Sequence, residues 1–171
     1  MKKDVVFRQN PEIDFLFGYF GEMDVPTKQE TYQPADVVGV DENGVEMMLR
    51  NYYVKRPNSK SVKAFTEYLQ SVARQKFDDQ NIIRKPDHVQ VHLSISVREE
   101  RFYDVDVDNL AKTVLDALKK VAYEDDCQVT SLNVDKHIHP MKNSGILIAI
   151  TKLTPERKGM QFEKMGDFTK L

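Results

Sequence analysis

The sequence predicts a single α/β (α+β) domain in which a mixed β-sheet packs against two main helices. Three observations support this fold class. Apolar and polar residues alternate over residues 88–97, which is typical of a half-buried strand. Apolar residues recur at helical spacing in two segments, 59–77 and 109–122. Further strand patterns flank these helices, and the order is strands, helix, strand, helix and two strands.

The first fifty residues are the hardest part of the chain to interpret. Residues 5–7 can open a strand, but residues 9–43 contain scattered aromatics and prolines without a sustained period. The sequence Asp41-Glu-Asn-Gly44 indicates a turn, because glycine adopts positive φ at little cost. Residues 45–54 then have the composition of a strand.

The segment 59–77 has both a start signal and an apolar face. Ser59 or Ser61 can cap its N-terminus, and Pro57 stands just before it. The apolar face consists of Val62, Phe65, Leu69, Val72 and Ala73. We therefore expect a helix here, followed by a loop over residues 78–86.

The second half of the chain has the clearest periodicity. A strand is expected over 88–97, and a helix over 109–122 with Asp108 as its N-cap. Two further strands are expected over 129–137 and 145–151, joined by a loop through Pro140.

The sequence also allows expectations for the domain organisation and the cellular location of the protein. We expect one domain over 1–153, in which residues 1–50 are divergent or inserted, and a polar, loosely ordered tail over 154–171. The most apolar window, 144–153, is too short to span a bilayer, and the N-terminus lacks the apolar part of a secretory signal. A single cysteine excludes an intrachain disulfide. These features favour a cytoplasmic protein.

The negative charge is concentrated in one short stretch. The net charge is −2 and the isoelectric point is about 6.1, which alone argues weakly against a nucleic-acid partner. Residues 104–126 contain seven acids and three bases, so the rest of the chain carries a net charge of +2. A bound cation could offset the charge of this stretch.

Five aspartates in this stretch are the candidate metal ligands. Asp104, Asp106 and Asp108 alternate in the chain, and in extended backbone alternate side chains share a face. Asp125 and Asp126 follow the predicted helix, just before the next strand. We expect the ends of the strands around this helix to bring both groups together.

A cluster of carboxylates needs a compensating charge. Two like charges 4 Å apart repel by about 4 kcal/mol at an intermediate dielectric. Oxygen ligands alone favour a hard ion such as Mg²⁺ or Mn²⁺. Spacing alone leaves an ordinary acidic turn at a helix start equally open. A calcium-binding EF-hand loop is excluded, because Asn109 and Leu115 stand where that loop needs glycine and glutamate.

The predicted helix carries a polar stripe of Asp108, Lys112 and Asp116. Asp116 lies about 12 Å from Asp108 along the axis, too far for both to bind one ion easily. Lys112 is within reach of either carboxylate. We expect Lys112 near the site and Asp116 at its margin.

Three linked motifs resemble the RusA-type Holliday junction resolvase family. They are Asp106-Val-Asp-Asn-Leu-Ala-Lys112, Leu115-Asp-Ala-Leu118 and Asp125-Asp-Cys-Gln-Val129, which fit the family patterns D-x-D-N-x-x-K, D-A-L and D-D-x-Q-V. The resemblance is good over 98–153, where Lys136 also fits a basic position. The turn after the helix lacks the glycine that is usual in the family.

The resemblance implies a RusA-like fold and a homodimeric, Mg²⁺-dependent endonuclease that cuts four-way DNA junctions, with Mn²⁺ as a substitute ion. The implied catalytic residues are Asp106, Asp108, Asp126 and Lys112, and the implied metal ligands are Asp106, Asp108, Asp126 and Asp125. Basic residues expected to contact DNA phosphates are Lys55, Arg56, Lys60, Arg98, Arg101 and Lys136. The alternative from another class is a non-enzymatic module that binds DNA or a divalent cation.

Overall fold

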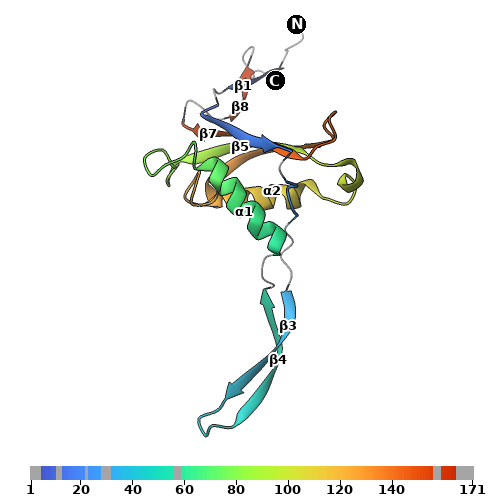
Figure 1. Ribbon diagram of the computed structural model, residues 1–171. Coiled ribbons are helices and arrows are strands. Elements are labelled where there is room, and N and C mark those ends of the chain that lie inside the picture. The colour runs from blue at the N-terminus through green and yellow to red at the C-terminus, as the bar shows by residue number, and fades with distance from the viewer. Residues whose placement is uncertain are drawn as a thin grey trace.

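A four-stranded mixed sheet forms the centre of the protein (Figure 1). Its strands, in order across the sheet, are β2 (Phe15–Phe20), β7 (Gly145–Leu153), β5 (His88–Ser96) and β6 (Val129–His137). β5 is antiparallel to β7 and parallel to β6. The computed structural model describes residues 5–10, 13–21, 23–27, 32–55, 59–155 and 159–164. The predicted fold class, a small domain with a mixed sheet and two main helices, is confirmed.

The parallel pair β5–β6 is connected through a helix, as parallel strands require. The chain leaves β5, makes the short 3-10 helix η1 (Glu99–Arg101) and enters α2 (Val107–Leu118). After α2, the short 3-10 helix η2 (Asp126–Gln128) leads directly into β6. This β5–α2–β6 unit contains all the motif residues predicted from the sequence.

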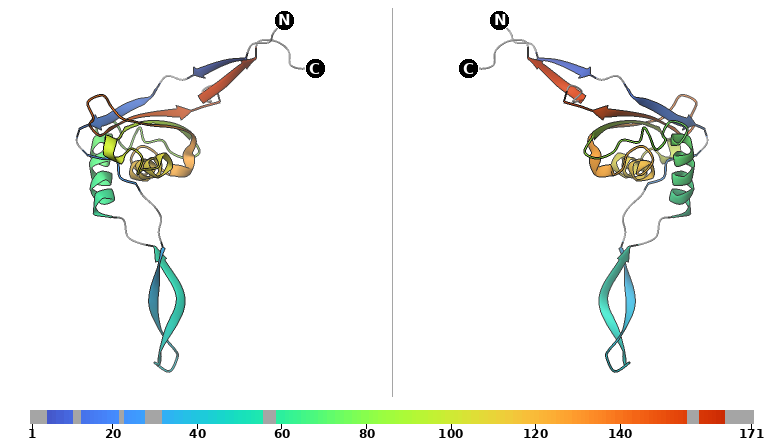
Figure 2. Two further views of the ribbon diagram at one scale, coloured as in Figure 1. Left: turned by 90° about the vertical axis from the view of Figure 1, so that its right-hand side faces the viewer. Right: turned by 90° about the vertical axis from the view of Figure 1, so that its left-hand side faces the viewer.

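Helices α1 (Lys60–Ala73) and α2 cover one face of the sheet and pack against each other (Figure 2). The core between helices and sheet is continuous, and its largest fully buried side chains include Tyr123, Phe65, Leu69, Leu93 and Ile148. The alternation predicted over 88–97 is confirmed, because Val89, Val91, Leu93, Ile95 and Val97 are all buried in this core.

Two further strand pairs lie outside the central sheet. β3 (Tyr32–Val40) and β4 (Glu46–Lys55) form an antiparallel hairpin that extends away from the helices and the sheet (Figures 1 and 2). Its turn is the one predicted at Asp41, whose carboxylate accepts hydrogen bonds from the backbone N–H groups of Asn43 and Val45, both at 2.9 Å. β1 (Val5–Asn10) pairs with β8 (Gly159–Lys164).

Both predicted helices exist, but both are shorter than predicted. Ser59 is the N-cap of α1, as predicted, and its Oγ accepts a hydrogen bond of 3.3 Å from the N–H of Val62. The helix ends at Ala73, and a turn follows it. α2 ends at Leu118, because Lys119 has an extended ψ of 135° and Lys120 a left-handed φ of 66°, and neither continues an α-helix.

Three strands were not predicted. β2 and β3 lie in the segment 9–43 that shows no period, and β8 lies in the tail that was expected to be loosely ordered. The tail prediction is therefore wrong over Gly159–Lys164. None of the helices in the described part of the chain is long and apolar enough to cross a membrane.

Candidate active site

The first group of motif carboxylates lies at the N-terminus of α2. Asp106 is the N-cap of this helix and Asp108 is in its first turn, so the prediction that Asp108 is the cap is wrong by two residues. Asp104, Asp106 and Asp108 are all exposed. The positive end of the helix dipole favours negative charge at this position.

Asp106 is an N-cap residue that does not use its side chain for capping. Its backbone is extended, with φ of −87° and ψ of 142°, but its carboxylate accepts no hydrogen bond from a backbone N–H of the first turn of the helix. Its Oδ2 instead accepts a long hydrogen bond of 3.4 Å from the side-chain Nδ2 of Asn109. The carboxylate of Asp106 is therefore oriented by the asparagine of the D-x-D-N motif and remains available to a ligand.

The second group of carboxylates lies beyond the C-terminus of α2 and is held by lysines. Lys119 Nζ lies 2.6 Å from Asp125 Oδ1 and 3.1 Å from Asp126 Oδ1. Lys85 Nζ lies 3.2 Å from Asp125 Oδ2. Hydrogen bonds from Lys119, then from Asp126 and Lys85, hold the pKa of Asp125 well below its ordinary value. The same pairing raises the pKa of Lys119.

Gln128, the glutamine of the D-D-x-Q-V motif, supports the backbone of the second group of carboxylates. Its side chain is buried, and its Nε2 donates hydrogen bonds to the carbonyl of Asp87 at 2.9 Å and to that of Ile83 at 3.3 Å. Its Oε1 accepts a hydrogen bond of 2.9 Å from the N–H of Asp125. Gln128 thus fixes the backbone that presents Asp125 and Asp126. This role was not predicted, because its partners come from a distant loop.

The structure does not bring the two carboxylate groups together within one chain. Asp106 and Asp108 follow the C-terminal end of β5, whereas Asp125 and Asp126 precede the N-terminal end of the parallel strand β6. The 12 residues of α2, about 18 Å of helix, lie between Asp106 at its N-terminus and Lys119, which contacts Asp125 and Asp126 at its C-terminus. Within the described residues, no three histidine, cysteine or acidic side chains are placed to hold a metal ion together. The expectation of one cluster per chain is therefore not met.

The predicted basic residue Lys112 lies in the middle of α2. It is exposed, and Asp116, one turn further along the helix, is half-buried. Lys112 is thus on the surface that joins the two groups of carboxylates. The apolar face of the same helix is buried and includes Leu110, Val114, Ala117 and Leu118.

Two of the predicted DNA-contacting arginines bind a carboxylate that sequence reasoning missed. Asp24 accepts hydrogen bonds from Arg98 Nε at 3.2 Å and from Arg98 Nη2, and Arg101 Nη1 lies 3.3 Å from it. Ser144 Oγ also donates to Asp24. Burial by itself raises the pKa of Asp24, but the hydrogen bonds from Arg98 and Ser144 and the charges of both arginines lower it overall.

The other predicted basic residues fall into three situations. Lys60 is the exposed first residue of α1. Lys55 ends β4, and Arg56 lies outside the described residues. Lys136 is partly buried, and its ammonium donates hydrogen bonds to two backbone carbonyls. Asp24 could not be found from the sequence, because more than seventy residues separate it from Arg98.

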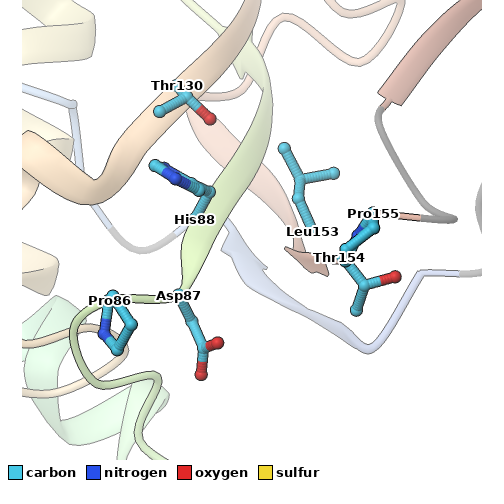
Figure 3. A pocket seen from close by; sticks show the side chains of 7 residues that line it. All are labelled: Pro86, Asp87, His88, Thr130, Leu153, Thr154 and Pro155. Atoms are coloured by element: carbon cyan, nitrogen blue, oxygen red, sulfur yellow. The ribbon is translucent and has the colours of Figure 1, made fainter.

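A pocket of about 580 Å³ lies at the start of β5 and is separate from the motif residues. It is lined by Pro86, Asp87, His88, Thr130, Leu153, Thr154 and Pro155, as Figure 3 shows. Its carboxylate, that of Asp87, lies 2.6 Å from Lys152 Nζ. None of the predicted site residues lines this pocket.

The comparison with protein families matches the part of the chain that contains the site. The family model for endodeoxyribonuclease RusA matches residues 45–151, which include both helices, β5, β6 and every predicted carboxylate. No individual curated protein matches the chain. The family match covers more than half of the chain, and the chain therefore belongs to the RusA endodeoxyribonuclease family, whose members hydrolyse phosphodiester bonds of DNA.

Proposed function

We propose that this enzyme is a Mg²⁺-dependent, structure-selective endodeoxyribonuclease that resolves four-way (Holliday) DNA junctions in recombination and repair. The observation that carries the proposal is the pair of carboxylate groups at the two ends of α2, inside the segment that matches the family. Every carboxylate of the D-x-D-N-x-x-K and D-D-x-Q-V motifs is present. This argues against the alternative of a non-enzymatic DNA-binding or cation-binding module.

The chemistry of the donor groups fits a hard divalent ion. Asp106, Asp108 and Asp126, with Asp125 as a further ligand, offer carboxylate oxygens alone, which suits Mg²⁺ and also its substitute Mn²⁺. When bound, such an ion lowers the pKa of a coordinated water and polarises the scissile phosphate. The chemical type of these ligands therefore fits the ion, although each end of α2 in one chain carries only part of the set.

The side chains of this protein supply the rest of the site. Lys112, exposed on α2 between the two carboxylate groups, offsets negative charge on the phosphoryl oxygens. Lys119 offsets part of the negative charge of Asp125 and Asp126, because its Nζ lies within 3.1 Å of both carboxylates. Two carboxylates that share one ammonium would otherwise repel each other.

The separation along α2 leads us to propose that the working enzyme is a homodimer with shared sites. Ligands of one Mg²⁺ lie at most about 4 Å apart, because each Mg²⁺–oxygen distance is about 2.1 Å. The 18 Å length of α2 exceeds this several-fold. A twofold axis can place Asp106 and Asp108 of one protomer beside Asp126 of its partner, and it creates two such sites. Two sites suit a junction that must be cut on two strands.

DNA binding is assigned to basic residues. These are Lys60, Arg98 and Arg101, together with Lys55, the last residue of the hairpin strand β4, and Arg56, which follows it in the chain. Such contacts give affinity that depends on salt and tolerates any sequence. We further propose that the enzyme acts in the cytoplasm, because its substrate is DNA and its single cysteine, Cys127, is free.

A labelled four-way junction tests the proposed function. The purified protein is incubated with the junction in Mg²⁺, in Ca²⁺ and in EDTA. Paired nicks near the crossover in Mg²⁺ alone support the proposal, and cutting of linear duplex at an equal rate contradicts it. Asp106→Asn should abolish cleavage while junction binding survives. Asp79→Asn removes an exposed carboxylate of the 78–86 loop and is the matched control, expected to cut normally.

A further inference from the structure

Lys136 lies where β6 meets the connection between β5 and α2, which consists of residues 97–106. It is the partner of Ile95 in the parallel pair β5–β6, one residue before the end of either strand. The connection starts here and ends at Asp106, the first carboxylate of the D-x-D-N motif. Lys136 is thus placed to act on the segment that delivers this carboxylate.

The ammonium of Lys136 is used internally. Its Nζ donates hydrogen bonds of 2.7 Å to the carbonyl of Phe102 and 2.7 Å to the carbonyl of Val105. It also lies 4.4 Å from the centre of the Phe102 ring, within the range of a cation–π contact. An ammonium has three protons, so two good acceptors and a ring face leave little capacity for a DNA phosphate.

The carbonyls bound by Lys136 are among those that the local turns leave unused. Within the connection, turn hydrogen bonds use the carbonyls of Arg98, Glu99 and Arg101. The neighbouring residue His137 accepts a hydrogen bond of 2.9 Å from the N–H of Val97. The end of β6 therefore holds the connection at its start through His137, and at its middle and end through Lys136.

We propose that Lys136 is a positioning residue for the carboxylates of Asp106 and Asp108. It fixes the carbonyl of Val105, which belongs to the same peptide group as the nitrogen of Asp106. A displacement of about 1 Å at a reacting group can reduce a rate by about a hundredfold. The proposal rests on the proposed nuclease function for its rate effect, and it is an alternative to the expectation that Lys136 contacts DNA.

The test compares Lys136→Met, which keeps an unbranched apolar side chain of similar size but removes the donors, with Lys136→Arg, which keeps charge and donors. Lys152→Met is the matched control, because Lys152 is a lysine on a strand of the same sheet whose ammonium binds another group, the carboxylate of Asp87. Three quantities are measured for each: kcat and KM on a four-way junction, junction affinity in Ca²⁺ across salt concentrations, and hydrogen exchange of the amides of residues 97–108.

Positioning predicts that Lys136→Met lowers kcat at least about tenfold, with junction affinity and its salt dependence unchanged. Hydrogen exchange of the backbone amides should accelerate in residues 97–108 and stay as in the wild type elsewhere. Lys136→Arg should restore slow exchange of these amides and most of kcat, and Lys152→Met should change neither quantity. If Lys136→Met does not fold, the arginine variant decides, since retained protection with kcat lost would overturn the proposal.

The opposite outcome is equally specific. If Lys136 contacts a phosphate, Lys136→Met weakens junction binding and lowers the salt-dependence slope by about 0.9, with kcat and hydrogen exchange unchanged. That result would overturn the proposal. Hydrogen exchange needs no substrate, so a wild-type protein that fails to cut junctions would refute the proposed function and still leave the contacts of Lys136 tested.

Discussion

Mixing two inactive variants tests whether the site is shared between protomers. Asp106→Asn disables the ligand group at the start of α2, and Asp126→Asn disables the group that follows it. If each site takes Asp106 and Asp108 from one protomer and Asp126 from the other, a mixed dimer has one site with both defects and one intact site. Random pairing makes half of the dimers mixed, so about one quarter of all sites are intact.

The activities expected for the single variants and for their mixture follow from the length of α2. Its 12 residues, about 18 Å of helix, lie between the two groups, whereas two ligands of one Mg²⁺ lie about 4 Å apart at most. No side-chain rotation closes this gap within a protomer while α2 stays helical. Each variant alone should therefore be inactive, and the coexpressed mixture should nick at about one quarter of the wild-type rate.

The assay is strand nicking of an end-labelled junction by coexpressed variants that carry different tags. Mixed dimers have one working site, so the products should be single nicks rather than paired cuts. A mixture of wild type with the double variant is the control, and shared sites leave about one quarter of activity there, whereas sites within one chain leave about one half. Inactivity of the mixture of single variants would refute the shared site.

Three further predictions concern single residues. Lys112→Ala should slow junction cleavage at least about tenfold, or about 1.4 kcal/mol of barrier, measured as kcat; an unchanged rate would make Lys112 an ordinary helix-surface residue. Lys120→Gly should raise the free energy of unfolding by about 0.5–1 kcal/mol in urea titration, because Lys120 has a φ of 66° that glycine adopts without strain. Asp24→Asn should lower thermal stability at pH 7. Since the pKa of Asp24 is lowered in the folded state, its contribution is present above its ordinary value of 3.8 and lost as the pH falls through the folded value. The difference between wild type and variant should therefore shrink below about pH 4 in a series of melting curves, and a constant difference would contradict the assigned role of Asp24.

The sequence was sufficient to predict the elements whose burial leaves a periodic pattern. The alternation from Val89 to Val97 predicted β5, because one face of that strand is buried against the helices. Ser59 predicted the start of α1 through the hydrogen bond that its hydroxyl accepts. Strands β2, β3 and β8 had no such pattern. Long-range pairing to β7 and β1 stabilises β2 and β8, and β3 pairs with β4 in a hairpin.

The candidate site was also predicted only in part. The motif residues were recognised in the sequence, because their types and spacing are local. Their arrangement in space was not predicted. A helix that joins two parallel strands begins near the C-terminal end of the first strand and ends near the N-terminal end of the second. The contacts of Lys136 with Phe102 and Val105, and of Asp24 with Arg98, join residues far apart in the chain, so no local spacing indicated them.

The length of α2 has a consequence for control of the enzyme. If the sites are shared between protomers as proposed, a newly made chain on its own carries only part of the ligand set at each end of that helix and should not nick DNA. At low abundance the cutting rate should then rise with the square of the protein concentration, because two chains must meet first. Under this proposal, a small amount of leaked protein should leave DNA uncut, and a modest increase in synthesis should start cleavage.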